Sequence, residues 1–62
     1  MRELEQVAVT PPGADTPSIR HWIMGEAERQ GWTHLRWEEG YDDAGRPMAR
    51  LKGVRPHEEE GA

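Results

Sequence analysis

The stretch WTHLRWEEGYDDAGRPMARLKGV, residues 32–54, predicts a β-hairpin. Its turn signal is the loop Asp-Ala-Gly, in which Gly45 supplies the left-handed conformation that a three-residue hairpin loop requires. This loop makes Asp42 and Arg46 the flanking pair, so the register of the two strands follows by counting outward. The stretch decides the fold because the register fixes which side chains share a face.

The register separates apolar from charged side chains. It sets Trp37 opposite Leu51, Glu38 opposite Arg50, Glu39 opposite Ala49, and Leu35 opposite Gly53. One face then carries the mainly apolar set Thr33, Leu35, Trp37, Tyr41, Ala49 and Leu51. A shift of one residue would scatter this set over both faces, so turn chemistry and apolar pairing agree on the hairpin. Trp37 is therefore expected in the core.

Residues 16–31 predict a helix with both ends marked. Thr16 can cap the N-terminus, and Pro17 suits the first helical position, where no N–H is needed. Gly31 supplies the left-handed residue that ends many helices, so Trp32 would fold back onto Ala27. An apolar stripe that can pack on a sheet is formed by Ile19, Trp22, Ile23 and Ala27.

A loose alternation over residues 3–10 predicts a first strand, which two prolines end. The expected fold class is therefore α+β with the order β-α-β-β. One helix would pack on the face of a three-stranded sheet that holds Leu35, Trp37, Ala49 and Leu51. The first strand could pair with either hairpin strand; we favour the third strand, with residues 47–54 central. Residues 1–55 would form a single small domain, followed by a disordered acidic tail at 56–62.

Composition restricts the classes of function. The chain has 62 residues, a net charge of −4 and no cysteine. A chain this short has a small core and is marginally stable unless a partner or a second copy covers more apolar surface. An acidic balance argues against a dedicated DNA-backbone binder. The absence of cysteine, of a signal peptide and of a membrane span predicts a soluble, cytoplasmic protein.

Reactive groups are too scattered to predict an enzyme. Ser18 is the only serine, and it lies in the first turn of the expected helix. The histidines have no metal-ligand spacing; they are His21, His34 and His57. Glu38 and Glu39 are adjacent on a strand and point to opposite faces, so they cannot act together as acid and base. We therefore expect no catalytic residue, no metal and no cofactor.

The second face of the sheet is the candidate partner-binding surface. It would present Trp32, His34, Arg36, Met48, Arg50 and Lys52. Arg36 opposite Lys52 is a like-charge pair that an acidic partner would relieve. Three interpretations stay open: a solvated outer face, a protein-binding or self-association face, and weak binding of single-stranded RNA through Arg36, Arg50 and Lys52.

These observations favour a non-enzymatic interaction or regulatory module that self-associates or binds a protein partner. The alternative is a small acidic inhibitor of a nucleic-acid-binding protein, as some phage proteins are. That hypothesis requires a single ridge of carboxylates formed by Glu38, Glu39, Asp42 and Asp43. The acids at 58–60 would add to it as an arm for a basic partner.

The helix ending GEAERQGW, residues 25–32, lies between a short strand and a polar hairpin. In this it resembles small bacterial β-α-β-β domains of unknown function whose helix ends in Ala-x-x-Gly-Trp. The matching residues are Ala27, shifted by one position, Gly31 and Trp32, while His34 stands where those domains have an apolar residue. The resemblance spans most of residues 4–54 and implies the topology, but no activity.

Overall fold

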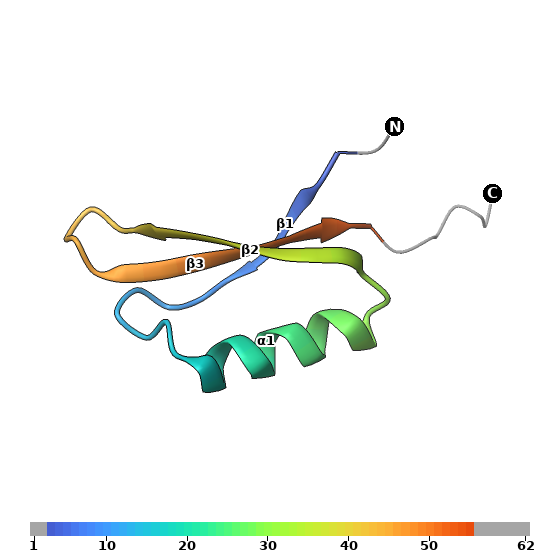
Figure 1. Cartoon of the computed structure of the whole chain (residues 1–62), viewed down its shortest axis with the longest axis horizontal. Helices are drawn as coiled ribbons and strands as arrows, with labels where there is room; N and C mark the ends of the chain where they lie inside the picture. The colour runs from blue at the N-terminus through green and yellow to red at the C-terminus, as the bar shows by residue number, and fades with distance from the viewer. Residues whose placement is uncertain (1–2, 56–62) are drawn as a thin grey trace.

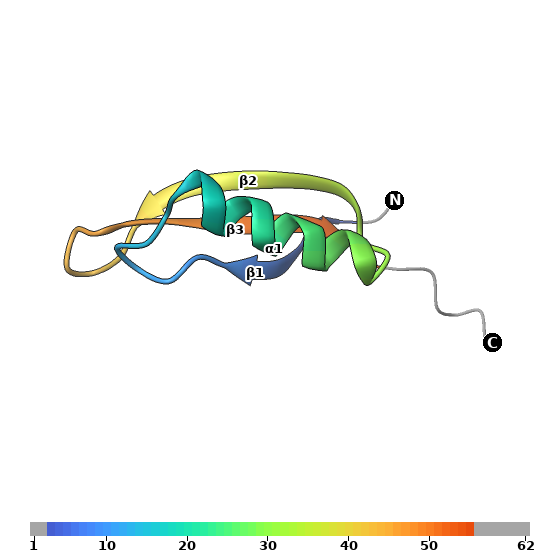
Figure 2. The ribbon, with the colours of Figure 1, turned by 90° about the horizontal axis from the view of Figure 1, so that it is seen from below.

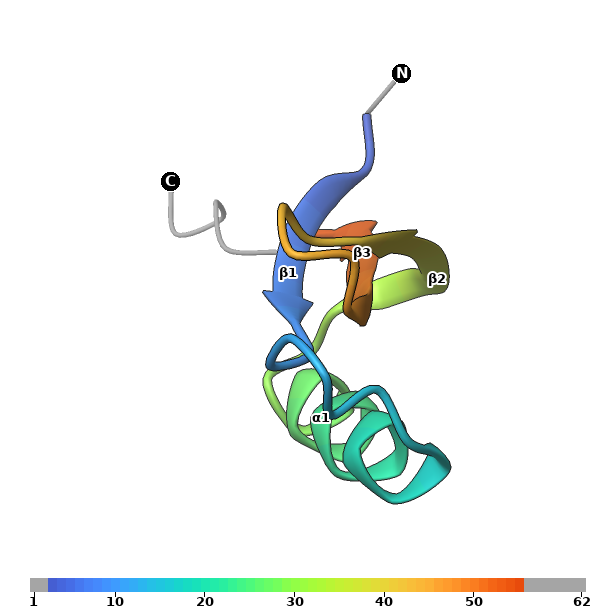
Figure 3. The same ribbon diagram turned by 90° about the vertical axis from the view of Figure 1, so that its left-hand side faces the viewer.

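The computed structural model describes residues 3–55, which form one helix and three strands (Figure 1). In chain order these are β1 (Glu5–Val9), α1 (Pro17–Arg29), β2 (Thr33–Tyr41) and β3 (Pro47–Val54). The helix covers one face of the sheet and leaves the other open (Figure 3). The predicted α+β class and β-α-β-β order are confirmed. The tail expected to be disordered, 56–62, lies outside the described residues. Within 3–55, no helix has the length and apolar character needed to cross a membrane.

The central strand of the sheet is β3, because the strand order is β1-β3-β2 and both pairings are antiparallel. The prediction that the first strand lies beside the third is confirmed. Seen from below, α1 runs across the face of β3 (Figure 2). This central position suits β3 because the side chains that it turns toward the helix are small or apolar. Those buried residues are Ala49, Leu51 and Gly53.

The hairpin pairing matches the predicted register around its turn. Trp37 lies opposite Leu51, Glu38 opposite Arg50, and Glu39 opposite Ala49. At the turn, the Asp42 N–H donates to the carbonyl oxygen of Arg46 at 3.0 Å, and Gly45 has a φ of 80°. Asp42 Oδ1 also accepts hydrogen bonds from the N–H groups of Ala44 and Arg46, at 2.9 and 2.8 Å. This carboxylate therefore holds the loop in the shape that fixes the register.

A bulge in β2 corrects the predicted faces of two residues. The register shifts before Arg36, so Thr33 lies opposite Val54, and His34 adopts a left-handed φ of 56°. An extra residue in one strand reverses the faces of the side chains that precede it. Trp32, expected on the open face, therefore packs against the core on the helix side. Thr33, expected on the helix side, is exposed.

The predicted start of α1 is confirmed. Thr16 takes extended backbone angles, and its Oγ1 accepts a hydrogen bond from the N–H of Ile19 at 3.2 Å. Pro17 is the first helical residue, where its ring suits the required φ and its missing N–H leaves no unpaired donor. The capping residue and the proline therefore set the first turn together.

The predicted end of α1 is confirmed as a Schellman motif. Gly31 has a φ of 92°, and its N–H donates to the carbonyl oxygen of Glu28 at 3.0 Å. The N–H of Trp32 donates to the carbonyl oxygen of Ala27 at 3.1 Å. These are the two hydrogen bonds of this helix ending, and the accompanying apolar contact is the packing of Trp32 on the core.

A small core lies between β3 and α1. Its buried members are Ile23, Ala27 and Leu51. The partly buried apolar residues around them are Val7, Ala8, Ile19, Met24, Trp32, Leu35 and Trp37. A Cβ atom at Gly53 would lie 2.6 Å from Leu35 Cδ2, so the absence of a side chain there lets Leu35 approach the central strand. The predicted core position of Trp37 is confirmed, and its ring is half-buried.

Two aromatic residues expected on the core are exposed instead. Trp22 is 66% exposed and Tyr41 is 74% exposed. The 13-residue helix is about 20 Å long, whereas the nine residues of β2 span about 30 Å, so α1 cannot cover the whole hairpin. Tyr41 ends β2 where the hairpin extends beyond the start of α1 (Figure 1). Trp22 lies on the flank of the helix beside the short strand β1.

Thr10 extends the pairing of β1 with β3 beyond the end of the strand. It is fully buried, and its N–H donates to the carbonyl oxygen of Ala49 at 2.9 Å. Its Oγ1 accepts a hydrogen bond from the N–H of Ala49, also at 2.9 Å. The hydroxyl thus serves as the acceptor that a backbone carbonyl supplies elsewhere in the ladder.

Replacement of Thr10 by valine tests this bond, because the variant keeps the shape and removes the acceptor. We expect Thr10→Val to lower the free energy of unfolding by about 1–3 kcal/mol, since a buried N–H loses its partner. The amide of Ala49 should also exchange faster with solvent. Thr10→Ser keeps the hydroxyl and should preserve the protection of that amide. Urea unfolding and amide hydrogen exchange measure both effects, and faster exchange in the serine variant would contradict the assignment.

A pair of glycine substitutions in and after α1 should have opposite signs. Gly31→Ala places a Cβ at a left-handed position and should lower the free energy of unfolding by about 1–2 kcal/mol. Gly25→Ala, where an added Cβ meets nothing within 4 Å, should raise it by roughly 0.5–1 kcal/mol. Urea unfolding of both variants gives the comparison. Equal effects of the same sign would show that the helix ending is not what makes Gly31 necessary.

Candidate functional site

The predicted partner-binding residues fall into two separate groups. The open face of the sheet holds Arg36, Met48, Arg50 and Lys52. Trp32 and His34 instead line a shallow hollow at the end of α1, together with Met24 and Leu35. The bulge in β2 causes this separation, because it moves Trp32 to the helix side and gives His34 a left-handed backbone conformation. The structure therefore does not bring the expected aromatic and basic groups together.

The open face is basic but carries none of the aromatic side chains of residues 3–55. Arg50 and Lys52 alternate with buried residues of β3, so they point away from the helix. Lys52 Nζ lies 3.6 Å from Glu38 Oε1, which offsets the like charge of Arg36 across the strands. Without an aromatic side chain for base stacking, this face offers single-stranded RNA only charge contacts.

The carboxylates proposed to form an acidic ridge are dispersed. Their cation partners differ: Glu38 contacts Lys52, Glu39 contacts Arg20, and Asp42 contacts Arg46. The first two point to opposite faces of β2, and the other two, Asp42 and Asp43, belong to the turn. The ridge on which the inhibitor hypothesis depends is therefore absent from residues 3–55, and the acids at 58–60 lie outside that range.

Arg20 joins three segments beside Trp37. Its Nε and Nη2 donate to the two carboxylate oxygens of Asp15 at 2.6 and 2.8 Å, and Nη2 also donates to Glu39 Oε2 at 3.3 Å. Its Cζ lies 5.2 Å from the centroid of the Trp37 ring, in cation–π range. The hydrogen bond from Arg20 lowers the pKa of Asp15, and the same bond raises the pKa of Arg20 above its ordinary value. This cluster fastens the start of α1 to β2.

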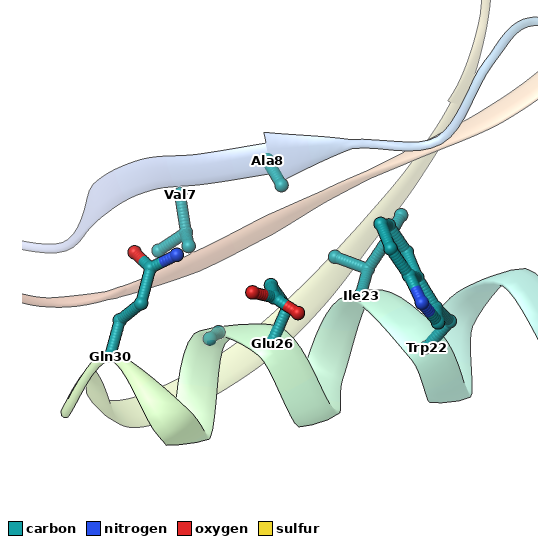
Figure 4. A pocket seen from close by; sticks show the side chains of 7 residues that line it. Val7, Ala8, Trp22, Ile23, Glu26 and Gln30 are labelled. Atoms are coloured by element: carbon teal, nitrogen blue, oxygen red, sulfur yellow. The ribbon is translucent and has the colours of Figure 1, made fainter.

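A groove that was not predicted from the sequence lies between α1 and β1 (Figure 4). Its apolar lining consists of Val7, Ala8, Ile23 and Ala27. Trp22 and Gln30 stand at opposite ends, and Glu26 lies between them (Figure 4). The groove has a volume of about 100 Å³, whereas pockets for small molecules usually hold about 300–1,000 Å³. A space of this size suits a side chain of another protein better than a metabolite.

Trp22 is the distinguishing residue of this groove because two thirds of its side chain is exposed. Tryptophan is enriched at the centres of protein interfaces, where covering it contributes most. One signal in the sequence could have pointed to it. A stripe that can pack on a sheet is already complete with Ile19, Ile23 and Ala27, at positions i, i+4 and i+8 of the helix. Trp22 is at position i+3, so it lies beside that stripe and not within it.

The outer edge of β1 borders the groove. Within the described part of the chain, β1 pairs with β3 alone, so its other edge has no strand partner. Glu5, the only acid of β1, lies 2.8 Å from Arg55 Nε, and Glu26 in the groove forms an ion pair with Arg29. The apolar lining is therefore flanked by carboxylates that already have cationic partners.

No three metal-ligating side chains among residues 3–55 lie close enough together to hold a metal ion. Comparison of the chain with protein-family models, curated proteins and solved structures yields no match. The function is therefore inferred from the geometry of the described surface.

Replacement of Asp15 by asparagine should change the dependence of stability on pH. The pKa of Asp15 is lower in the folded chain than its ordinary value of about 4. The ionised carboxylate therefore stabilises the folded chain fully at any pH above that ordinary value. The contribution is lost as the pH falls through the folded pKa. We expect Asp15→Asn to be less stable than the wild type at pH 7 and to lose less stability in acid. Urea unfolding between about pH 2 and 7 measures both effects.

Asp43→Asn is the control for the change in net charge, because Asp43 lies in the exposed turn. It should keep the loss of stability in acid that the wild type shows. The same flattened profile in both variants would show that the bond between Asp15 and Arg20 is not its cause.

Proposed function

We propose that this chain is a non-enzymatic interaction module that binds another protein chain through the groove at Trp22 and the adjoining edge of β1. The observation that carries the proposal is the exposure of a tryptophan beside an apolar groove. The sheet and the Arg20 cluster act as the scaffold that holds this surface in place. A cytoplasmic setting, expected from the sequence, is part of the proposal.

Burial of Trp22 by a partner would contribute substantially to association. A tryptophan side chain buries about 150–250 Å² when it is fully covered. At about 25 cal/mol per Å², covering the exposed two thirds contributes roughly 2.5–4 kcal/mol before the entropic cost of association. A contribution of this size is that of an interface hot spot. It would also add apolar burial to a domain with few fully buried side chains.

The groove and the strand edge together favour one binding mode. An extended segment can pair with a free sheet edge through backbone hydrogen bonds, while a neighbouring pocket receives one of its side chains. Here the edge of β1 would supply the backbone groups, and the groove beside Trp22 would receive the side chain. The volume of about 100 Å³ agrees with a single inserted side chain.

Binding of single-stranded RNA at Arg36, Arg50 and Lys52 is an alternative with less support. Sequence-tolerant RNA binding combines a basic surface with aromatic stacking. The aromatic residue expected to supply the stacking, Trp32, packs on the helix side of the sheet. We therefore treat the open face as a solvated surface and assign binding to the groove.

Trp22→Ala tests the proposed function, with Tyr41→Ala as the matched control, because each variant removes one exposed aromatic side chain. Tagged full-length chains would recover binding proteins from the native host. Each recovered protein would then be identified, purified and titrated against the wild type and both variants. We expect Trp22→Ala to raise the dissociation constant at least about tenfold and Tyr41→Ala to change it less than about threefold.

Two results would contradict the proposal. One is a purified partner that binds both variants with the affinity of the wild type. The other is a folded wild-type chain that binds no protein, a second copy of itself included.

A further inference from the structure

We infer that the partner for this surface is a second copy of the same chain, which pairs its β1 antiparallel with β1 of the first copy. This inference rests on the proposed function and names the occupant of the groove. The two three-stranded sheets would then form one continuous sheet, and both helices would lie on the same side of it. Four features of the edge and the groove support this occupant.

The first feature is the difference between the two edges of the sheet. Along β2, the exposed charged residues Arg36, Glu38 and Glu39 oppose pairing with another strand. The sequence of β1 is EQVAV, which carries one charge, at its first residue. No lysine or proline protects β1 between Glu5 and Val9. The edge of β1 is therefore the one that is open to association.

The second feature is that the side-chain pattern of β1 reads the same in both directions. Gln6 and Val9 lie opposite open-face residues of β3, whereas Val7 and Ala8 both line the groove. The irregularity between Gln6 and Ala8 produces this out-in-in-out order. A two-fold axis between Val7 and Ala8 would set Val7 of one copy opposite Ala8 of the other, and Gln6 opposite Val9. Each pair then joins two residues of the same face. An antiparallel pair requires this match.

The third feature is the position of Trp22 relative to that axis. Trp22 and Gln30 stand at opposite ends of the groove (Figure 4). They are eight residues apart on the helix, which corresponds to about 12 Å. A two-fold axis near the middle of β1 brings the Trp22 end of each copy toward the Gln30 end of the other. The amide oxygen of Gln30 is then a suitable acceptor for the indole N–H of the second copy.

The fourth feature is charge. Each copy has a net charge of −4, so two copies repel one another unless the contact region is close to neutral. At this edge the acids have cationic partners: Glu5 contacts Arg55, and Glu26 contacts Arg29. Charge therefore does not oppose association at the groove.

The contact involves one short strand and one flank of a helix, so it belongs to the small class of interfaces, below about 1,200 Å² in total. We therefore expect a reversible dimer with a dissociation constant of about 1–100 µM. Sedimentation equilibrium of the purified full chain over that concentration range measures it. Trp22→Ala should raise the constant at least about 30-fold, and the matched control Tyr41→Ala should change it less than about threefold.

Amide hydrogen exchange at low and high protein concentration tests the strand edge without a substitution. We expect amides of β1 to gain protection at high concentration, while those of β2 keep the same protection. Circular dichroism of both variants confirms that each is folded before its association is compared. A dimer that gains protection on β2, or one whose dissociation constant is unchanged by Trp22→Ala, would overturn the inference.

The outcomes separate this inference from the proposed function. A wild-type chain that stays monomeric above about 100 µM overturns the dimer. If that monomer still binds another protein in a manner that depends on Trp22, the proposed function stands. If it binds no protein at all, both fail.

Discussion

The packing of Leu51 against α1 is the contact on which the rest of this structure depends. Leu51 is fully buried at the centre of the middle strand, where it meets Ile23 and Ala27 of the helix. Because β3 pairs with both β1 and β2, this contact holds the helix to the whole sheet. The small residues Ala49 and Gly53 are buried on the same strand, and larger, partly buried side chains lie around the central contact. The groove lies beside this central contact, and Ile23 and Ala27 line both.

Most of the fold could be predicted from the sequence because local chemistry determines it. The Asp42 turn sets the hairpin register, and Thr16 and Gly31 mark the two ends of the helix through hydrogen bonds to near neighbours. The bulge at His34 could not be predicted in this way. A left-handed histidine has no strong signal of its own, and it follows from how the helix ending and β3 meet in space.

The candidate site was harder to predict than the fold for a related reason. Strict alternation along β2 assigned Trp32 to the open face, and one extra residue was enough to reverse that assignment. Helical periodicity assigned Trp22 to the core. How much of the helix surface the sheet covers, however, depends on the short strand β1 beside it. The first error comes from a local bulge and the second from the short strand beside the helix, and neither follows from the residue pattern alone.

The way in which α1 is attached has a consequence for how the molecule opens. Arg20 joins the start of the helix to β2, and the Schellman motif with Trp32 joins its end to the same strand. Among the described residues, no hydrogen bond or ion pair connects α1 with β1; the contact between them is apolar. The helix and hairpin therefore form one cooperative unit, from which β1 can detach during a local fluctuation. A strand from elsewhere could take its place without breaking a polar contact to the helix.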